Sequence, residues 1–467
     1  MRIVMKFGGT SVADGSKIKN VASLIKRFYD EKNEVIIVVS ALSGVTDQLE
    51  KMARKASEDG GITDVKAFIE HIRGRHYAVA QEAVVEGEIK VVIEELDARL
   101  KDLEDALISI CHLRELTARS HDYLSSFGER LSAPILSASL KSMNLRSIAL
   151  KGGDAGIVTD SNFTSARPLF DMTYTKVKER IFPLLEKNII PVITGFVAAD
   201  AKGIITTLSR GGSDYTASII GAAIDADEIW IWTDVDGIMT ADPRIISEAR
   251  TLPIISYLEA MELSYFGAKV LHPKTIEPAI QKGITVRVRN TFNPEHPGTL
   301  IIKAHEHIKD IVKAVTLIQN IALINISGSG MAGTPGVAGR VFSALGRIGA
   351  NIMMISQGSS EANISLVIDK TQLDISLHAL QTEFTENIIK DISYDENVCV
   401  IAVVGDGMTG TPGVAGRVFS ALGRIGANIM MISQGSSEAN ISFVVNRSDA
   451  QKALRALHDE FKLGVER

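Results

Sequence analysis

The sequence has few cysteines, no long apolar run and no excess of positive charge. Its 467 residues include only 2 cysteines, Cys111 and Cys399, which lie far apart and outside any CxxC or Cys/His cluster. Neither a disulfide framework nor a structural zinc site is therefore expected. The formal net charge of −6 gives no overall attraction to nucleic acid or to an anionic membrane. No apolar run reaches the roughly 18 residues of a membrane span, and the first residues read as a strand rather than a signal peptide, so we expect a cytoplasmic protein.

Short apolar runs alternate with longer amphipathic stretches over the first 300 residues. This rhythm is typical of an α/β domain whose mostly parallel sheet is covered by helices on both faces. Ligands of such domains bind at the carboxyl ends of the strands. We expect this domain over residues 1–302, followed by a linker over 303–310. The predicted strands span 3–7, 35–39, 147–150, 189–194, 204–208, 228–233, 285–288 and 299–302, and the main helices span 17–29, 65–86, 89–112 and 213–224.

An internal repeat follows this domain. Residues 328–365 recur at 405–442, and the copies differ only at Ser329/Asp406 and Ala332/Thr409. Each copy predicts a strand, a glycine-rich turn, a helix, two strands and a closing polar helix, with one further strand still to be supplied. The pattern therefore indicates two small α+β modules in tandem.

Each copy also contains a GxGxxG sequence between a strand and a helix, at 328–333 and 405–410. A dinucleotide-binding unit would place an acidic residue about 20 positions further on, at the end of the next strand. The first copy has Met353, Met354 and Ser356 there, and Pro335 stands at its helix start. We therefore do not expect NAD to bind to either copy.

The segment TTLSRGGSDYT at 206–216 carries the strongest functional signal. It leads from an apolar run through two glycines into a helical pattern rich in alanine and isoleucine. Such a turn lets backbone N–H groups approach an anion, and the helix N-terminus adds the positive end of its dipole. An anionic ligand is expected there. The alternative is a tight turn capped by Ser213, with Arg210 and Asp214 paired on the surface.

Other polar segments follow further predicted strands. Lys6 ends the first strand just before two glycines, and a lysine beside an N–H-rich turn suits the β- and γ-phosphate oxygens of a nucleotide, although the chain has no Walker A sequence. Ser43 follows the second strand and fits a helix N-cap as well as a ligand. Glu129 opens a helix, where a carboxylate ordinarily stabilises the helix dipole. The acidic segment 232–244 fits either the edge of a nucleotide pocket or a surface loop.

In this order the segments resemble the amino-acid kinase superfamily, and within it the aspartate kinases. The matching motifs are KFGGTSV at 6–12, FGERLSAPI at 127–135, TTLSRGGSDYTA at 206–217, WTDVDGIMTADPR at 232–244 and FGAKVLHP at 266–273, followed by paired regulatory ACT modules. The resemblance covers essentially the whole chain. It implies a three-layer, carbamate-kinase-like sandwich followed by two ferredoxin-like ACT domains, the first over 318–391 and the second over 392–467 together with a strand over 311–317.

The resemblance also implies an activity. Aspartate kinases transfer the γ-phosphoryl group of ATP, with Mg²⁺, to the β-carboxylate of L-aspartate, which gives 4-phospho-L-aspartate for lysine, threonine and methionine biosynthesis. The β-carboxylate is already ionised at pH 7, so no general base is required. A fused homoserine dehydrogenase is not expected in a chain of this length. Two other functions stay open, a kinase for another carboxylate, amine or nucleotide and a catalytically silent amino-acid sensor.

Residue roles follow from the resemblance by matching position. It implies that Glu129 takes the substrate ammonium and Arg210 its α-carboxylate, and that Mg²⁺ is carried by ATP with no assigned protein ligand, Asp214 being an organiser of lysines or metal. Ser209 and Met239 depart from the family, which often has Gly and Tyr at these positions. The implied sets are Lys6, Asp214 and Lys269 for catalysis; Ser40, Thr46, Glu129, Arg210 and Ser213 for the substrate; and Lys6, Gly8, Gly9, Thr233, Asp234, Met239, Arg244, Lys269 and Val270 for ATP.

The ACT modules imply an amino-acid effector and a homo-oligomer, a dimer through these modules or a tetramer. Gln357 and Gln434 resemble a glutamine of threonine-sensitive relatives and favour threonine over lysine, although a glutamine at a strand end also fits a turn. Because the copies are nearly identical, we expect two similar effector sites. Their implied residues are Met331, Gly336, Asn351, Ile352 and Gln357 in the first copy and Met408, Gly413, Asn428, Ile429 and Gln434 in the second.

Overall fold

The structure is a computed structural model that describes residues 1–209, 211–266, 275–303, 311–358, 362–384, 388–435 and 437–465. None of the helices in these ranges is both long enough and apolar enough to cross a membrane. The chain divides into two compact units. The first contains Met1–Ile238, Pro253–Tyr257 and the described residues from 275 to Lys303, and the second contains Met239–Leu252 and the C-terminal region. The expected domain over 1–302 is thus interrupted, because residues 239–252 group with the second unit.

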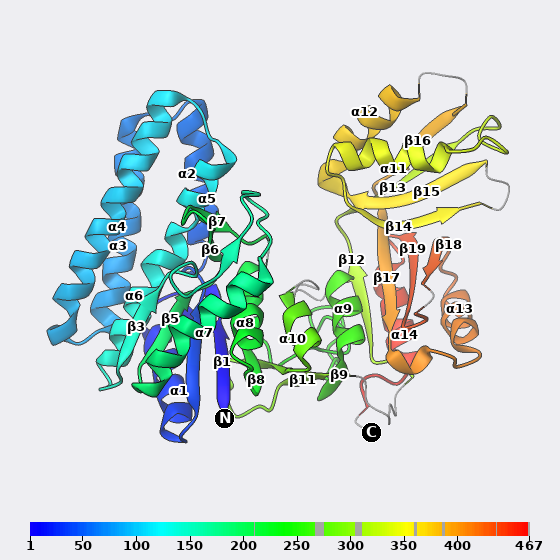
Figure 1. The fold of residues 1–467 in the computed structure, drawn as a ribbon. Coiled ribbons are helices and arrows are strands. Elements are labelled where there is room, and N and C mark those ends of the chain that lie inside the picture. The colour runs from blue at the N-terminus through cyan, green and yellow to red at the C-terminus, as the bar shows by residue number, and fades with distance from the viewer. Residues whose placement is uncertain are drawn as a thin grey trace. The chain divides into compact units, whose positions relative to one another are not determined.

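An eight-stranded sheet forms the centre of the first unit (Figure 1). Its order is β3-β5-β2-β1-β8-β10-β11-β9, and the paired strands are parallel except for β10 with β11. Strand β2 has the sequence EVIIVV and is buried from Val35 to Val39, as expected for a parallel strand covered on both faces. The strands are β1 (Arg2–Phe7), β2 (Glu34–Val39), β3 (Ser147–Leu150), β5 (Ile190–Thr194), β8 (Glu228–Thr233), β9 (Ile254–Ser256), β10 (Thr285–Asn290) and β11 (Thr299–Ile302).

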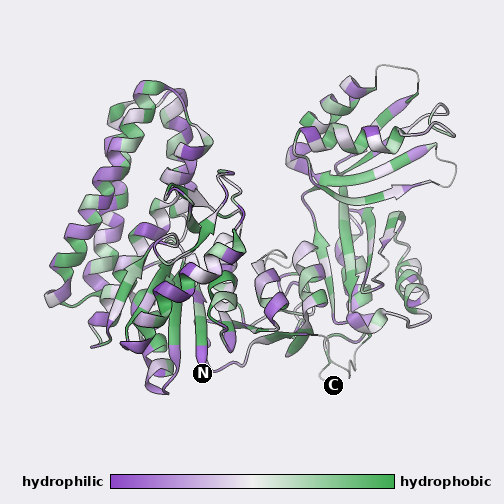
Figure 2. Ribbon diagram, in the orientation of Figure 1, coloured by the Kyte–Doolittle hydropathy of each residue, from purple (hydrophilic) through white to green (hydrophobic). Residues whose placement is uncertain are grey.

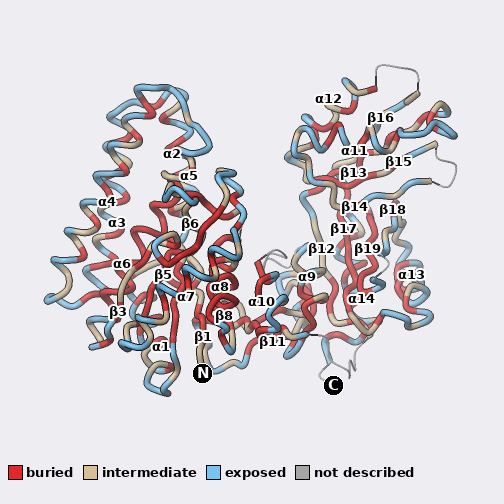
Figure 3. Tube along the Cα trace, in the orientation of Figure 1, coloured by how far each residue is buried: buried red, intermediate tan, exposed pale blue. Residues whose placement is uncertain are grey.

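Helices cover both faces of this sheet, which confirms the predicted three-layer α/β class. Alternate residues of β1 and β2, such as Met5 and Ile37, pack into one cluster with Ile18 and Ile25 of α1. Helices α7 and α8 also pack against the sheet. Figures 2 and 3 show its central strands as mostly hydrophobic and buried, between helices of mixed colour. The helices are α1 (Gly15–Asp30), α2 (Val45–Glu58), α3 (Ile62–Ala83), α4 (Glu86–Leu113), α5 (Ala118–Ser125), α6 (Phe127–Lys141), α7 (Phe170–Glu186), α8 (Gly212–Ala223) and α10 (Glu277–Lys282), with the 3-10 helix η1 (Gly9–Val12).

The topology brings several chain segments to one edge of the sheet. Strands β1, β2 and β8 are parallel neighbours, so Phe7, Val39 and Thr233 end at the same edge. A separate three-stranded sheet, β4-β6-β7, carries the chain into α8. Its strands are β4 (Val158–Thr159), β6 (Val197–Asp200) and β7 (Ile205–Thr207).

The second unit contains two four-stranded antiparallel sheets, one for each copy of the repeat. The first copy forms the sheet β14-β15-β13-β16, and the second forms β12-β17-β19-β18. The elements are α9 (Tyr257–Tyr265), β12 (Ala314–Ile318), β13 (Ile321–Ser327), α11 (Val337–Arg347), β14 (Ile352–Gln357), β15 (Asn363–Asp369), η3 (Lys370–Gln372), α12 (Leu373–Glu383), β16 (Asp391–Asp395), β17 (Val398–Val404), η4 (Asp406–Met408), α13 (Val414–Arg424), β18 (Ile429–Gln434), β19 (Asn440–Asn446) and α14 (Ala450–Glu460).

The extra strand of each sheet comes from outside the repeated sequence. Strand β12 precedes the first copy and pairs with β17 of the second copy, from Ala314↔Val404 to Ile318↔Val400. Strand β16 pairs with β13 in the sheet of the first copy. We expected the boundary between the modules after residue 391, whereas the backbone pairing of β16 extends the first module to Asp395.

Candidate active site

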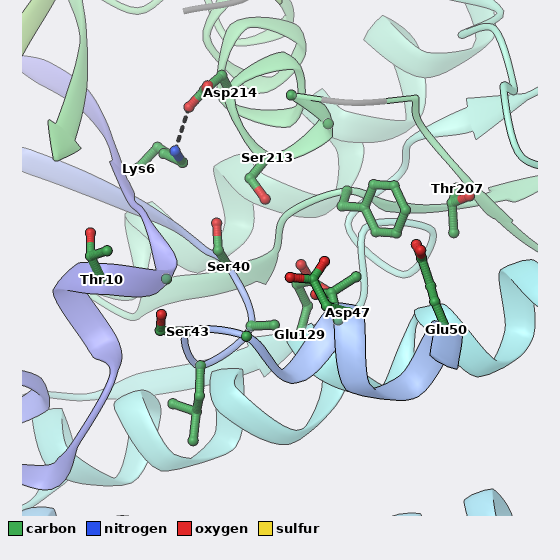
Figure 4. A pocket seen from close by; sticks show the side chains of 18 of the residues that line it. Lys6, Thr10, Ser40, Ser43, Asp47, Glu50, Glu129, Thr207, Ser213 and Asp214 are labelled. Atoms are coloured by element: carbon green, nitrogen blue, oxygen red, sulfur yellow. Dashed lines mark ion pairs between the residues drawn. The ribbon is translucent and has the colours of Figure 1, made fainter. Parts of the chain in front are cut away.

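One cavity of about 690 Å³ lies at the carboxyl ends of β1, β2 and β8 (Figure 4). Segments distant in the sequence meet there, including the starts of α2 and α8, the first turn of α6 and the end of β7. Nine residues that the sequence assigned to catalysis, substrate or ATP line it, namely Lys6, Gly9, Ser40, Thr46, Glu129, Ser213, Asp214, Thr233 and Asp234. The predicted position of the site, at the strand ends, is therefore where the structure places the cavity.

Lys6 and Asp214 form an ion pair across this cavity. Lys6 Nζ lies 2.6 Å from Asp214 Oδ1, and only 12% of each side chain is exposed. Asp214 stands in the first turn of α8, so the helix dipole also favours its negative charge. The alternative placed Asp214 on the surface, whereas its side chain is largely buried and forms an ion pair with Lys6. Arg210 itself lies outside the described residues.

Two helices begin at the cavity with a glycine in a left-handed conformation. Gly44 precedes α2 with φ 76°, and Gly211 precedes α8 with φ 80°, a backbone region that residues with a side chain seldom adopt. Neither glycine can cap its helix with a side chain, so backbone N–H groups of the first turn are left for other partners. Ser43 is therefore not the helix N-cap that the sequence allowed, and it lines the cavity.

Glu129 is a buried carboxylate in the wall of the cavity, in the first turn of α6. Burial raises the pKa of Glu129 to about 8, although hydrogen bonds from the backbone N–H groups of Ala41 and of Glu129 itself favour the charged form. Its Oε2 atom has no hydrogen-bond partner among the described residues. A buried acceptor of this kind suits a cationic group of a ligand.

The sequence did not single out several residues of the cavity wall. Asp47 and Glu50 come from α2, His121 from α5, and Thr164 from the loop after β4. Thr46 could have indicated Glu50, because side chains four residues apart on a helix lie on the same face. Nothing in the local sequence of His121 or Thr164 marks them, since tertiary packing brings them to the site.

The remaining predicted ligands either fall outside the described residues or do not line the cavity. Lys269 and Val270 fall outside the described residues. Gly8 is not among the residues that line the cavity, and its N–H donates to Trp232 O at 3.3 Å. Met239 and Arg244 belong to the second unit, where Met239 bridges to Thr251 and Arg244 pairs with Asp242 at 2.6 Å.

A second, smaller cavity of about 200 Å³ lies in the first repeat. Three predicted effector residues line it, Met331, Gly336 and Gln357. Asn351 and Ile352 do not line it, and Asn351 N donates instead to Gln372 Oε1 at 3.2 Å.

In the matching turn of the second repeat, two backbone N–H groups donate hydrogen bonds to carboxylates. Asp406 N donates to Glu259 Oε1 of α9 at 2.9 Å, and Gly410 N donates to Glu438 Oε2 at 2.7 Å. Of the predicted effector residues there, Met408 is buried, Gly413 precedes α13 with φ 87°, and Asn428, Ile429 and Gln434 flank or form β18.

Comparison with known proteins gives the same architecture. Residues 1–290 match the amino acid kinase family, and residues 324–384 and 401–461 each match an ACT domain. The structure is similar to Escherichia coli aspartokinase III in complex with aspartate and ADP, with a TM-score of 0.84, 28% identity and coverage of 98% of this chain and 99% of that one. It is also similar to the same enzyme in complex with lysine and aspartate, with a TM-score of 0.82 and 28% identity over 98% and 99% of the two chains.

The sequence is 35% identical to aspartokinase 1, chloroplastic, of Arabidopsis thaliana, over 98% of this chain and 80% of the relative. It is 37% identical to the bifunctional aspartokinase/homoserine dehydrogenase 2, chloroplastic, of the same plant, over 98% of this chain. The chain spans about half the length of such bifunctional relatives, 50% in this comparison. The chain belongs to the amino acid kinase family. Within that family, the two ACT domains and the full-length similarity to aspartokinases place it among the aspartate kinases.

Proposed function

We propose that this protein transfers the γ-phosphoryl group of ATP to the side-chain carboxylate of L-aspartate. One observation carries the proposal, namely the cavity that holds the Lys6–Asp214 ion pair together with the buried Glu129. The lysine suits phosphate oxygens, and the Glu129 Oε2 atom, which has no hydrogen-bond partner among the described residues, suits an ammonium group. An amino acid with a second carboxylate satisfies both ends of this cavity.

The reaction brings two anions together, so its main requirement is positive charge and orientation. Aspartate needs no general base, since its β-carboxylate is ionised at neutral pH. Lys6 and the backbone N–H groups at the starts of α2 and α8 offset the repulsion between carboxylate and phosphate. Arg210 on the α-carboxylate and Lys269 on the phosphates complete the proposal, on the strength of the sequence motifs alone.

ATP and Mg²⁺ belong to the same proposal. Gly9 fits a phosphate-binding turn, because a Cβ atom there would lie 2.9 Å from Ala41 O and hold the turn away from the end of β2. Thr233 and Asp234 line the cavity where β8 ends. Mg²⁺ bound with ATP would supply further positive charge at the phosphates, and the proposal assigns it no protein ligand.

The test is ATP-dependent formation of aspartyl hydroxamate, in which hydroxylamine traps the acyl phosphate. Product with L-aspartate, and none with L-glutamate or without ATP, would support the proposal. A folded protein that binds ATP but forms no aspartyl hydroxamate would contradict it. That outcome would favour a different substrate or an amino-acid sensor.

We also propose that an amino acid regulates the enzyme from the cavity of the first repeat. Gln357 lines this cavity and favours threonine, whereas the similar E. coli enzyme was solved with lysine. Adding each amino acid separately to the hydroxamate assay distinguishes them. Inhibition by threonine supports the assignment of Gln357, and inhibition by lysine alone would overturn it. A homo-oligomer through the ACT domains is part of this proposal, and analytical ultracentrifugation measures it.

A further inference from the structure

Asp122 joins two walls of the candidate active site, although its side chain does not line the cavity. It is fully buried in α5. Asp122 Oδ2 accepts the N–H of Thr207 at 2.9 Å, and Oδ1 accepts the Thr207 hydroxyl at 2.7 Å. The same two oxygens accept the N–H of Thr164 at 2.9 and 3.0 Å. Thr164 and Thr207 both line the cavity, so one buried carboxylate fixes two parts of its wall.

Thr164 depends on such a partner because of its backbone. Its φ is 69°, in the left-handed region, where a β-branched residue is strained. Strain of this kind costs on the order of 1–3 kcal/mol and persists only where the surroundings impose it. Asp122 accepts the N–H of Thr164. In the same loop, the N–H of Ala166 donates to Thr207 O at 3.1 Å.

Thr207 is the last residue of β7 and therefore sets where the next turn begins. Leu208 N follows with a bond to Phe196 O at 2.9 Å, and Gly211 then leads into α8 with Ser213 in its first turn. Figure 4 shows Thr207 and Glu50 on the side of the cavity away from Lys6 and Asp214. Asp122 thus fixes the part of the site that lies away from the proposed phosphate end.

We propose that Asp122 is a positioning residue for L-aspartate, which it serves by holding Thr164 and the end of β7 in the geometry that binds the substrate. This inference rests on the proposed aspartate kinase function. Asp122 acts through its neighbours, so its loss weakens aspartate binding and leaves ATP binding unchanged.

The pKa of His121 offers a second measurement of the role of Asp122, independent of the KM values. It precedes Asp122, lines the cavity, and its Nδ1 lies 4.0 Å from Asp122 Oδ1 and 3.5 Å from Ser125 Oγ. The interaction with Asp122 raises the pKa of His121, and burial opposes it. Of the charges from α2, Glu50 also raises this pKa and Arg54 lowers it, while Asp47 lines the same cavity. The ionisation of His121 therefore reports the charge at position 122.

The experiment compares Asp122→Asn with Asp200→Asn in the full chain. Asparagine keeps one carbonyl oxygen as an acceptor. Its NH₂ group replaces the second oxygen, which in the wild type accepts from Thr164 and Thr207. For Asp122→Asn we expect the KM for L-aspartate to rise at least tenfold and the KM for ATP to change less than twofold. The pKa of His121, followed by NMR of ring-labelled histidine, falls in the same variant, because the negative charge that raises it is gone.

Asp200→Asn is the matched control. Asp200 is also a buried carboxylate, but it accepts the N–H groups of Lys202 and Ile204 in the β6–β7 turn, both at 2.9 Å, and the hydroxyl of Ser161 at 3.0 Å. It does not line the cavity. We expect this variant to lose thermal stability while both KM values and the His121 titration stay as in the wild type.

An aspartate KM within twofold of the wild type in Asp122→Asn would overturn the inference, as would equal rises in both KM values in both variants. If Asp122→Asn does not fold, Thr207→Val removes a single bond to Asp122, and it should raise the aspartate KM severalfold with no change for ATP. Absence of hydroxamate from the wild type is a different outcome. It overturns the proposed function, and this inference with it.

Discussion

At the scale of the residue, Lys6 is the group on which turnover depends most directly. Lys6→Met removes the cation at the phosphate end and leaves Asp214 largely buried without its partner. We expect hydroxamate formation to fall by about 10²–10³-fold, the order found when one preorganised electrostatic contact is lost. The free energy of unfolding should fall by about 3–5 kcal/mol, because breaking a buried ion pair leaves an uncompensated charge.

Lys17→Met is the matched control for this prediction. Lys17 pairs with Asp14 at 3.2 Å on the surface, and surface pairs contribute about 0–1 kcal/mol. The rate of hydroxamate formation by Lys17→Met should stay within twofold of the wild-type rate. Turnover above one tenth of the wild-type rate in Lys6→Met would show that Lys6 is not a catalytic residue.

The raised pKa of Glu129 leads us to expect that a proton is released when the substrate binds. Its pKa of about 8 in the free protein leaves it mostly protonated at pH 7, whereas an ammonium group beside it would favour the charged form. Calorimetry at pH 7 in buffers of different ionisation enthalpy should therefore detect close to one proton released per L-aspartate bound. The KM for aspartate should fall as the pH rises from 6 to 8. In Glu129→Gln the proton release disappears, and binding that still releases a proton would contradict the role of Glu129.

The same raised pKa sets the sign of a stability change. The folded chain binds a proton at Glu129 between the ordinary carboxyl pKa of 4.5 and about 8, where the unfolded chain does not. The contribution of this group to stability is thus fully present below pH 4.5 and is lost as the pH rises through 8. Glu129→Gln should raise the melting temperature at pH 8.5 more than at pH 5. Equal changes at both values would show that Glu129 is not buried as a neutral acid.

The sequence located much of the site because of one rule of parallel sheets. Lys6, Ser40 and Thr233 each follow a strand, and parallel strands end at a common edge. It did not locate Asp122 or Thr164, because a buried hydrogen-bonding carboxylate and a left-handed threonine are products of tertiary packing. Neither has a periodicity or motif that a single sequence displays.

At the scale of the element, the turns of the two nearly identical repeats have different surroundings among the described residues. Gln357 lines the cavity of the first repeat, whereas in the second repeat Glu259 of α9 accepts the N–H of Asp406. Gln357→Ala and Gln434→Ala make the same change in the same local sequence. We expect the first to raise the effector concentration for half-inhibition at least tenfold and the second to raise it less than threefold. Equal shifts would instead support the two similar sites that sequence identity predicts.

At the scale of the element, the periodicity of apolar residues predicted the elements but not all of their pairing. The periods of apolar residues predicted most strands of the large sheet and the βαββα order of each repeat. They did not assign β16 to the first module, because its Asp391–Asp395 sequence is largely polar and only its pairing with β13 identifies its sheet. Strand pairing over a distance is decided by packing, and periodicity alone does not report it.

At the scale of the whole molecule, the segment 239–252 belongs to the C-terminal unit. Thr240 Oγ1 lies 3.2 Å from His458 Nε2, Val315 N donates to Thr240 O at 2.9 Å, and Arg250 Nε donates to Leu463 O at 2.8 Å. The motif WTDVDGIMTADPR therefore runs from one compact unit into the other. The regulatory region and the kinase region are not separable by a single cut in the chain.

This connectivity predicts which large deletion the protein tolerates. The first module is inserted between β12 and β17, and the register Ile318↔Val400 makes Asn320 the neighbour of Val398 across the two strands. Replacing residues 321–397 by Asn-Gly should close a two-residue hairpin, since that dipeptide favours the type I′ turn. We expect a folded enzyme that forms aspartyl hydroxamate within about threefold of the wild-type rate and no longer responds to threonine or lysine.

Ending the chain at Lys303 should have the opposite result, although it removes the whole C-terminal region. Thr240, Arg250 and Glu259 would lose His458, Leu463 and Asp406, and the apolar side chains of Ala241 and Ile246 would lose the core that they share with α14. The expected outcome is a chain with little hydroxamate activity and a broad thermal transition. If the truncated chain were instead fully active and the hairpin variant unfolded, the second module would not be needed to fold the segment 239–252, and the division of the chain into these two units would be wrong.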